Sequence, residues 1–333
     1  MRDLAARITR HTESLLLAVI LLLGVLLTLS TPYFLTLQNL VDLIESYSVT
    51  TVLALGVFVV LVAGGIDISF AATASVAQYV TAYLATALGL PAFVAIPLGL
   101  AIGLLLGCLN AALIYYLRVT SIIITIATMS VYFALLMWLT GGKSIYALPD
   151  WWSTRIVFFQ TETASGDLVR ITLPIVVAAV AGLITWLLMT RTSAGRQLTA
   201  MGGNVEAARR LGVNIAAMHF LAYGYLGLMA GMAGLLQAHR VGESVPNAMV
   251  GQELNVVAAA VLGGASLNGG IGSVGGVLLG VLLLAMLQNG LNLLGVSPYF
   301  FQIVIGLVIL VSTSITGLSA RARRRDRRAA AAA

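Results

Sequence analysis

The chain has 333 residues, of which 60% are hydrophobic and 9% are charged, and its mean hydropathy is +1.02. Soluble globular domains carry about 25% charged residues, so this composition excludes that class. The net charge of +6 does not indicate nucleic-acid binding, because the basic residues gather at the chain ends and in loops beside apolar runs. The apolar runs are continuous and lack the alternation of a β-barrel, so they predict an all-α polytopic transmembrane protein.

The N-terminal segment, residues 1–14, carries Arg2, Arg7 and Arg10 ahead of the apolar run 15–30. A signal peptide has the same order, but its apolar region is shorter and an Ala-x-Ala cleavage site follows it, which this sequence lacks. We therefore expect a cytoplasmic segment and a retained first span. Beyond it, Asp42 and Glu45 lie among leucines at spacings typical of an amphipathic helix at the membrane interface.

Further apolar stretches of roughly 20 residues, the length that crosses the hydrocarbon core as a helix, follow along the chain. The glycine-rich sequences at 64–65 and 263–276 interrupt them, so we expect glycine-broken helices, as in transporters. The sequence predicts about ten spans, at 15–30, 49–63, 67–88, 92–117, 121–139, 171–189, 218–237, two around the glycine run between 253 and 294, and 298–318.

Charge asymmetry supports this count. Ten spans with the N-terminus inside make 15–318 the transmembrane domain, place the loop 190–217 and the basic tail 319–333 in the cytoplasm, and place the loop 141–170 outside. Of the 18 Lys and Arg, all except Lys143, Arg155, Arg170 and Arg240 then lie inside, as the positive-inside rule requires. We interpret the tail as an anchor to lipid headgroups.

The loop 190–217 is a long polar segment between two strongly apolar flanks, and it carries four arginines against a single acid, Glu206. Within it, Asn204 is a helix-capping residue, Glu206 lies in the first turn that would follow, and Gly212 suits a helix end. The sequence therefore predicts a short helix lying across the cytoplasmic surface.

Four motifs occur along the chain in a characteristic order. Residues 195–212 read Gly-x-x-x-x-Ala-x-Gly-Gly-Asn-x-Glu-Ala-Ala-Arg-x-x-Gly, residues 64–69 read Gly-Gly-Ile-Asp-Ile-Ser, residues 140–142 read Thr-Gly-Gly, and Glu-Leu at 253–254 is followed by Gly-Gly at 263–264. Together these motifs resemble those of permease subunits of ribose-type ABC importers, the bacterial sugar permeases that also look like branched-chain amino-acid permeases. One departure is Asn255, where the family commonly has aspartate.

The resemblance implies the partners of such a permease. These are a cytoplasmic ABC ATPase, a periplasmic solute-binding protein and a second permease copy or paralogue, in the bacterial inner membrane with both termini cytoplasmic. It implies an ATP-driven import of a sugar or sugar-like solute, with ATP and magnesium bound by the ATPase and no cofactor on this chain. The ATPase-coupling residues that it implies are Gly202, Gly203, Asn204, Glu206, Ala207, Ala208 and Gly212.

Polar side chains inside the expected spans are candidates for the translocation pathway. Asp67 near membrane depth is costly unless it is paired or solvated, and it either caps the following helix or lines the route. Neutral amides suit uncharged polyhydroxylated ligands, because each amide both donates and accepts hydrogen bonds, but they also join helix pairs. The pathway candidates are Asp67, Ser69, Gln78, Asn110, Glu253, Asn255 and Asn289.

Two other functions remain as alternatives. An ion-coupled secondary transporter of a small polar solute would need acids on several spans, and the sequence offers essentially Asp67. An intramembrane enzyme would need a nucleophile and a base at matching depth, and no such set or metal motif occurs. A phosphate-binding loop is also missing, because Gly142-Lys143-Ser144 lacks the leading glycine of that motif. We expect a transporter subunit without enzymatic activity.

Overall fold

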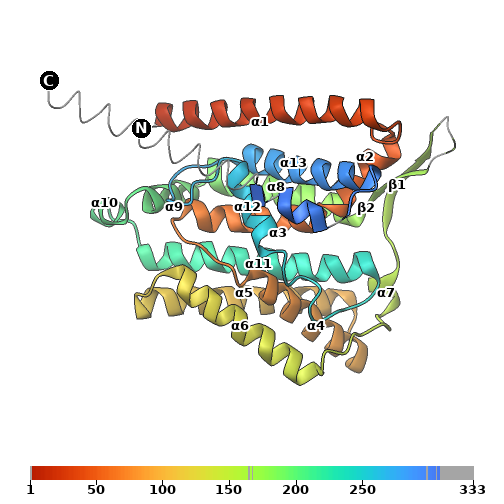
Figure 1. Cartoon of the computed structure of the whole chain (residues 1–333). Coiled ribbons are helices and arrows are strands. Elements are labelled where there is room, and N and C mark those ends of the chain that lie inside the picture. Colours follow the sequence, from red (N-terminus) through yellow and green to blue (C-terminus); the bar gives the residue numbers. More distant parts are fainter. Residues whose placement is uncertain (1, 164–165, 167, 298, 305, 308–333) are drawn as a thin grey trace.

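The computed structural model describes residues 2–163, 166, 168–297, 299–304, 306 and 307, with side chains from residue 13 on. These residues form long helices that lie side by side, as Figure 1 shows, with a small β-hairpin at one end of the bundle. The elements are α1 (Arg2–Ser30), α2 (Leu37–Ser46), α3 (Ser48–Val62), α4 (Phe70–Leu88), α5 (Ala92–Leu117), α6 (Ser121–Thr140), α7 (Asp150–Ser153), β1 (Val157–Glu162), β2 (Leu168–Thr172), α8 (Leu173–Arg191), α9 (Ser193–Gly203), α10 (Val205–Arg210), α11 (Ile215–Val241), α12 (Glu253–Leu262) and α13 (Val274–Leu293).

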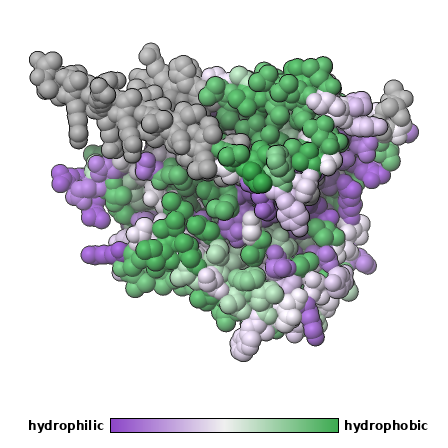
Figure 2. Space-filling view, viewed as in Figure 1, coloured by the Kyte–Doolittle hydropathy of each residue, from purple (hydrophilic) through white to green (hydrophobic). Residues whose placement is uncertain are grey.

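Helix α3 is the centre of the core. Its sequence, SVTTVLALGVFVVLV, is apolar on every side, and a helix of that kind is stable only when other elements surround it. Accordingly α8, α11, α12 and α13 all contact it, and Leu53, Leu55 and Phe58 are each 1% exposed or less. The outer helices α1, α5 and α6 carry many exposed leucines and isoleucines instead, and Figure 2 shows the hydrophobic surface of α1 at the top of the view.

The tightest helix pair is α5 with α11. Glycines lie on both sides of the crossing, so the two backbones meet directly: a methyl group at Gly103 would lie 2.3 Å from the carbonyl oxygen of Gly227. A methyl group at Gly107 would lie 2.3 Å from the carbonyl oxygen of Tyr223. Because lipid tails are as apolar as the helices, close backbone approach of this kind is a main source of helix association in membranes.

The count of about ten spans is not confirmed. Among the described residues, six helices are long and apolar enough to cross a membrane, or seven when α2 and α3, which are bent by 47°, count as one. The predicted span 67–88 forms α4, which does not meet the same apolar criterion, and the one beginning at Glu253 forms α12, which has only ten residues. Most of the tenth predicted span and the tail 319–333 lie outside the described residues.

The glycine sequences break helices where the sequence predicted. Helix α3 ends at Val62, and Gly64 follows with a positive φ of 87°. An irregular segment then leads to α4. The run 263–276 separates α12 from α13, with positive φ at Gly264, Gly269 and Gly270. Only glycine adopts these left-handed conformations without strain.

The loop 141–170 contains structure that the sequence analysis missed. Strands β1 and β2 pair antiparallel, and Arg155 ties them to α2 because its guanidinium donates to both carboxylate oxygens of Glu45, at 2.8 and 3.0 Å. Trp152, which is 3% exposed, donates its indole N–H to the carbonyl oxygen of Leu235. Trp151 donates its indole N–H to the carbonyl oxygen of Leu90 at 3.2 Å, so the tryptophan pair attaches this loop to the ends of two other segments.

Candidate functional site

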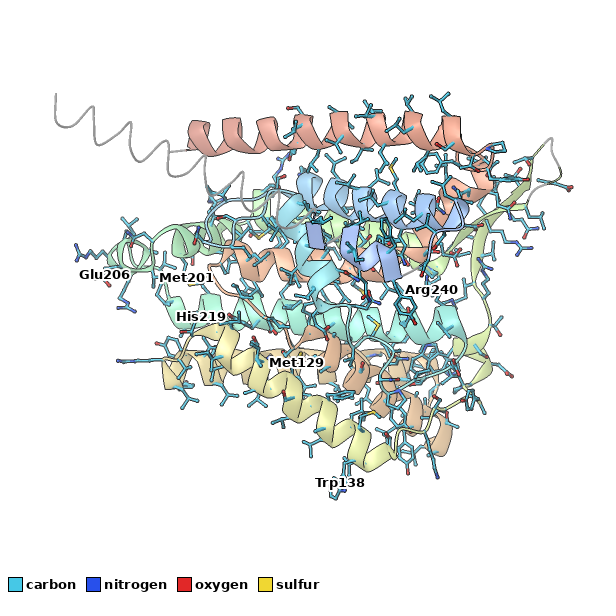
Figure 3. The ribbon with its side chains drawn as sticks, viewed as in Figure 1. Met129, Trp138, Met201, Glu206, His219 and Arg240 are labelled. Carbon is cyan, nitrogen blue, oxygen red and sulfur yellow. The ribbon has the colours of Figure 1, made fainter. Side chains whose placement is uncertain are left out.

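The α9–α10 hairpin (193–210) lies at one end of the molecule and the β-hairpin lies at the opposite end (Figure 1). Helix α8 follows β2 directly and leads into α9, so it connects the two hairpins in the chain. In Figure 3, Glu206 on α10 points away from the body of the molecule, and hydrophilic side chains cover this end in Figure 2. The predicted polar loop is thus a helical projection at the end of the bundle.

Local hydrogen bonds explain why α10 forms. The Asn204 side chain accepts from the backbone N–H of Ala207 at 2.9 Å, as predicted for a cap, and the chain turns away at Gly212 with a φ of 83°. Glu206 accepts from Arg209 and Arg210 at 3.4 Å each, three and four residues along the same helix. These exposed ion pairs each contribute only about 0.3–0.5 kcal/mol, so the cap and the glycine determine the short helix.

The predicted coupling residues divide into two groups. Gly203, Asn204, Glu206, Ala207 and Gly212 are exposed. Ala208 is 2% exposed and packs into the main hydrophobic core, and Gly202 contacts the backbone of the α3–α4 connection. Asn204, Glu206 and Ala207 therefore offer a surface to another molecule, whereas Gly202 and Ala208 attach the hairpin to the bundle.

Three of the predicted pathway residues meet in one buried network. The carboxylate of Asp67 accepts from the backbone N–H and from the hydroxyl of Ser69, both at 2.7 Å. Asn110 on α5 donates to the Ser69 hydroxyl at 2.7 Å and to the second Asp67 oxygen at 3.4 Å. Tyr132 on α6, which the sequence analysis missed, donates to the Asn110 carbonyl at 3.3 Å. The network joins α4, α5 and α6 around an acid that is 3% exposed.

The network shows which groups Asp67 contacts at the start of α4. Ser69 is the N-cap residue of α4 and its own side chain makes no capping hydrogen bond. Asp67 instead holds Ser69 and reaches Asn110, so it stabilises the turn before α4 and fixes it to α5. Bonds from two neutral donors on Ser69 and one on Asn110 give the buried carboxylate the partners that it requires.

A polar cavity of about 380 Å³ lies among α2, α3, α11, α12, α13 and the loop 248–252. Its volume falls within the range of about 300–1,000 Å³ that is typical of small-molecule sites. Figure 3 shows Arg240, which lines it, on the opposite side of the molecule from Glu206. Its amide side chains come from three helices and one loop, and they are Gln237, Gln252, Asn255, Gln288, Asn289 and Asn292.

Hydrogen bonds hold several of these amides in place. Asn289 and Asn39 exchange two side-chain bonds, at 2.9 and 3.1 Å, and Tyr47 donates to the Gln288 carbonyl. Asn255 donates to Gln252 at 3.3 Å. The cavity therefore has ordered polar walls, which can present both donors and acceptors to a ligand.

Only two of the seven pathway candidates, Asn255 and Asn289, line this cavity. Gln78 is buried on α4, next to the position that a methyl group on Gly234 would take. The sequence analysis missed Gln237 and Arg240, which lie three residues apart at the end of α11. Their spacing on one helix face was the available signal.

Glu253 begins α12, outside the cavity lining. One carboxylate oxygen accepts from the backbone N–H of Gly251 at 2.8 Å, and the other, which is buried, has no hydrogen-bond partner among the described residues. Burial raises the pKa of this carboxyl, and the hydrogen bonds from the backbone of Glu253 and Gly251 oppose that shift. These contacts place Glu253 where the loop ends and α12 begins.

The sequence profile described as "Branched-chain amino acid transport system / permease component" matches residues 39–313. The chain belongs to this permease family. It is the membrane component of an ABC-type importer and not an enzyme, and ATP hydrolysis takes place on a partner ATPase.

Individual relatives are similar over nearly their whole length. The ribose import permease protein RbsC of Escherichia coli (strain K12) is 32% identical over 300 residues, 90% of this chain and 92% of the relative. The galactose/methyl galactoside import permease protein MglC of Salmonella typhimurium is 32% identical over 314 residues, with the same two coverages of 90% and 92%. The RbsC protein of Bacillus subtilis is 33% identical over 291 residues, 87% and 88% of the two chains. No solved structure matches significantly.

Proposed function

We propose that this permease imports a sugar or sugar-like solute across the bacterial cytoplasmic membrane. The observation that carries the proposal is the cavity of about 380 Å³ with six amide side chains in its wall. Each hydroxyl of a sugar both donates and accepts, and an amide matches it with one carbonyl and one NH₂ group. The names of the relatives, which specify ribose and galactose, favour the same class of solute.

We assign the two ends of the molecule to the two sides of the membrane. The cavity and the β-hairpin lie toward the end that would face the periplasm and receive solute from a binding protein. The exposed residues Asn204, Glu206 and Ala207 would dock an ABC ATPase in the cytoplasm, where ATP and magnesium bind that partner. A second permease, identical or paralogous, completes the assembly, and both termini lie in the cytoplasm beside anionic lipid.

A branched-chain amino acid is the second candidate solute. The cavity wall also contains Asp42 and Arg240, which could pair with the ammonium and carboxylate groups of a zwitterion. Arg240, however, already donates to the carbonyl oxygen of Ser46 at 2.9 Å, and the amides outnumber these charges. We therefore favour the uncharged, hydroxylated solute.

The test uses the chain co-expressed with its ATPase and binding protein and reconstituted in liposomes. Glu206→Arg should abolish copurification of the ATPase, whereas Glu162→Arg, the same charge reversal at the β-hairpin end, should preserve it. In the intact complex, Asn292→Leu should lower uptake of radiolabelled ribose or galactose without lowering basal ATP hydrolysis. Leucine uptake in place of sugar uptake would select the second candidate. Retention of the ATPase by Glu206→Arg would contradict the docking surface.

A further inference from the structure

Three chain segments meet backbone to backbone at the base of the α9–α10 hairpin. They are the end of α9 at Gly202, the end of α3 with the following turn (62–64), and the loop between α12 and α13 at 269–270. The backbone N–H of Gly270 donates to the carbonyl oxygen of Val62 at 2.9 Å. This bond satisfies one of the carbonyls left without a partner at the end of α3. We call this contact the glycine junction.

The glycine junction has no free space. A methyl group at Gly202 would lie 1.9 Å from the Val62 carbonyl oxygen, 2.8 Å from the Gly270 nitrogen and 2.9 Å from the Ala63 carbonyl carbon. A methyl group at Gly269 would lie 2.6 Å from the Gly202 carbonyl oxygen and 2.7 Å from the Gly64 Cα. All of these neighbours are backbone atoms, which cannot turn aside as a side chain does. A displacement of α9 therefore also moves the end of α3 and the loop between α12 and α13.

The contacts continue from the glycine junction into the bundle. The Ile66 N–H donates to the Ser121 hydroxyl at 3.0 Å, and the Ile68 N–H donates to the Thr125 hydroxyl at 3.3 Å. Ser121 and Thr125 belong to the first turns of α6. Between these two bonds lies Asp67, which reaches Asn110 on α5. A continuous series of short contacts thus runs from α9 to α5 and α6.

We propose that Gly202 is a positioning residue that transmits movement of the α9–α10 hairpin to the Asp67 turn, and through it to α5 and α6. The proposal rests on the proposed function, because it requires an ATPase that moves the hairpin. Gly202 does not touch the ATPase or the solute. Its missing side chain lets the hairpin and the turn move as one body, and coupling of this kind needs a contiguous physical connection whose parts shift together.

The neighbouring glycine provides a matched control. Gly203 follows directly in α9, and a methyl group there meets no heavy atom within 4 Å. Gly202→Ala and Gly203→Ala therefore make the same chemical change one residue apart, but only the first forces the glycine junction open. We would purify both variants with the ATPase and binding protein, reconstitute them in liposomes, and measure sugar uptake and ATP hydrolysis in the same sample.

Gly202→Ala should retain the ATPase and its basal hydrolysis but transport at least about tenfold less sugar for each ATP hydrolysed, a loss within the usual range of coupling between sites. Gly203→Ala should keep the wild-type ratio of sugar transported to ATP hydrolysed, because it leaves the glycine junction closed. Equal transport by the two variants, or an equal loss in both, would overturn the proposal. A wild-type chain that binds no ATPase would instead refute the proposed function.

If Gly202→Ala does not accumulate as a folded chain, Ser121→Ala takes its place. This variant removes the hydroxyl that accepts from Ile66 and adds no atom to the glycine junction. The same split, with ATP hydrolysis retained and transport per ATP reduced, supports the connection. Unchanged transport by Ser121→Ala overturns it.

Discussion

At the scale of single residues, several polar side chains inside the bundle pair with one another. Asp67 has donors on Ser69 and Asn110, and Asn289 has its partner in Asn39. An unpaired polar group in an apolar interior loses its bonds to water and gains none, which makes such pairing necessary. The same pairs join helices that are distant in sequence, so one set of interactions serves stability and architecture together.

The Asp67 network predicts an order of stability among its variants. Asn110→Leu leaves the second oxygen of Asp67 and the hydroxyl of Ser69 without their donor, so the free energy of unfolding should fall by about 1–3 kcal/mol. Tyr132→Phe removes one hydroxyl, which donates to the carbonyl oxygens of Asn110 and Leu106, and should cost only about 0.6 kcal/mol. Thermal unfolding in detergent micelles compares the two variants. Equal destabilisation would show that Asn110 acts through packing alone.

Glu253 predicts a dependence of stability on pH. Burial raises the pKa of this carboxyl in the folded chain above its value in the unfolded chain, so the folded state holds its proton more tightly. The stabilisation from this group is complete below the unfolded pKa and is lost as the pH rises through the folded pKa.

Glu253→Gln keeps an oxygen that can accept from Gly251 and removes the titration. The difference in melting temperature between variant and wild type should therefore move in favour of the variant as the pH rises from acidic to neutral. Melting curves recorded at several pH values measure it. A difference that does not change with pH would contradict the raised pKa.

At the scale of helices, the packing depends on where glycine lies. In α5 and α11 the glycines of one helix face the backbone of the other, which sets the distance between the axes. In α3 the surrounding helices bury every face, so no polar stripe exists to orient it. The rotation of such a helix about its own axis is set by how its side chains fit those of its neighbours, because its apolar residues are spread over every face.

A pair of Gly→Ala variants tests this distinction. At Gly103 the new methyl group would lie 2.3 Å from the Gly227 carbonyl oxygen, so α5 and α11 must separate and stability should fall by about 1–3 kcal/mol. At Gly182 on α8 the nearest heavy atom, the Leu55 Cδ1, lies at 3.9 Å, which is ordinary contact. Gly182→Ala should therefore be neutral or stabilise by about 0.5–1 kcal/mol, because alanine favours the helix. The melting temperatures of both variants measure this difference in stability. A Gly103→Ala variant as stable as the wild type would contradict the close contact between α5 and α11.

At the scale of the whole molecule, the surface chemistry divides the chain into an apolar middle and two polar ends (Figure 2). The α9–α10 hairpin lies at one end and the β-hairpin at the other, with α8 between them (Figure 1). Since α8 is long and apolar enough to span a membrane, the two hairpins are expected on opposite sides of it. Under the proposed function, the binding protein and the ATPase would dock at these opposite ends.

Labelling of introduced cysteines tests that arrangement. Cys108 is the single cysteine and can be replaced by alanine to give an unreactive background. In spheroplasts, a membrane-impermeant maleimide should label Thr161→Cys on β1 at once, and should label Arg210→Cys on α10 only after the membrane is permeabilised. Labelling of both from the same side would contradict the single crossing by α8.

Much of the architecture was predictable from local sequence. The breaks at Gly64 and in the run 263–276, the cap at Asn204 and the helix end at Gly212 depend on conformational preferences of single residues, and all are present. The number of spans was not predictable in the same way. The sequence around α12 predicts a longer apolar span, but α12 itself has only ten residues. A hydropathy pattern registers apolar length and is insensitive to where a helix stops within it.

The candidate site was predictable in part. The sequence indicated Asn255 and Asn289 by chemistry alone, and it missed Gln237 because that residue lies near a helix end beside charged neighbours. It also grouped Gly202 with the exposed residues of α10, whereas the structure places Gly202 against the α3–α4 connection. The sequence does not reveal such contacts, because the residues that contact Gly202 belong to distant segments of the chain, the end of α3 and the loop between α12 and α13.

By itself, the sequence determined the membrane class, the helical content and the motifs of an importer permease, because these follow from composition and from the preferences of neighbouring residues. Only the tertiary structure decided which polar groups face each other: Asn110 with Asp67, Asn39 with Asn289, and six amides around one cavity. The physical reason is that helices such as α3 and α5 are apolar on all sides. Their rotation and their partners are therefore set by close packing between distant segments, which no local pattern encodes.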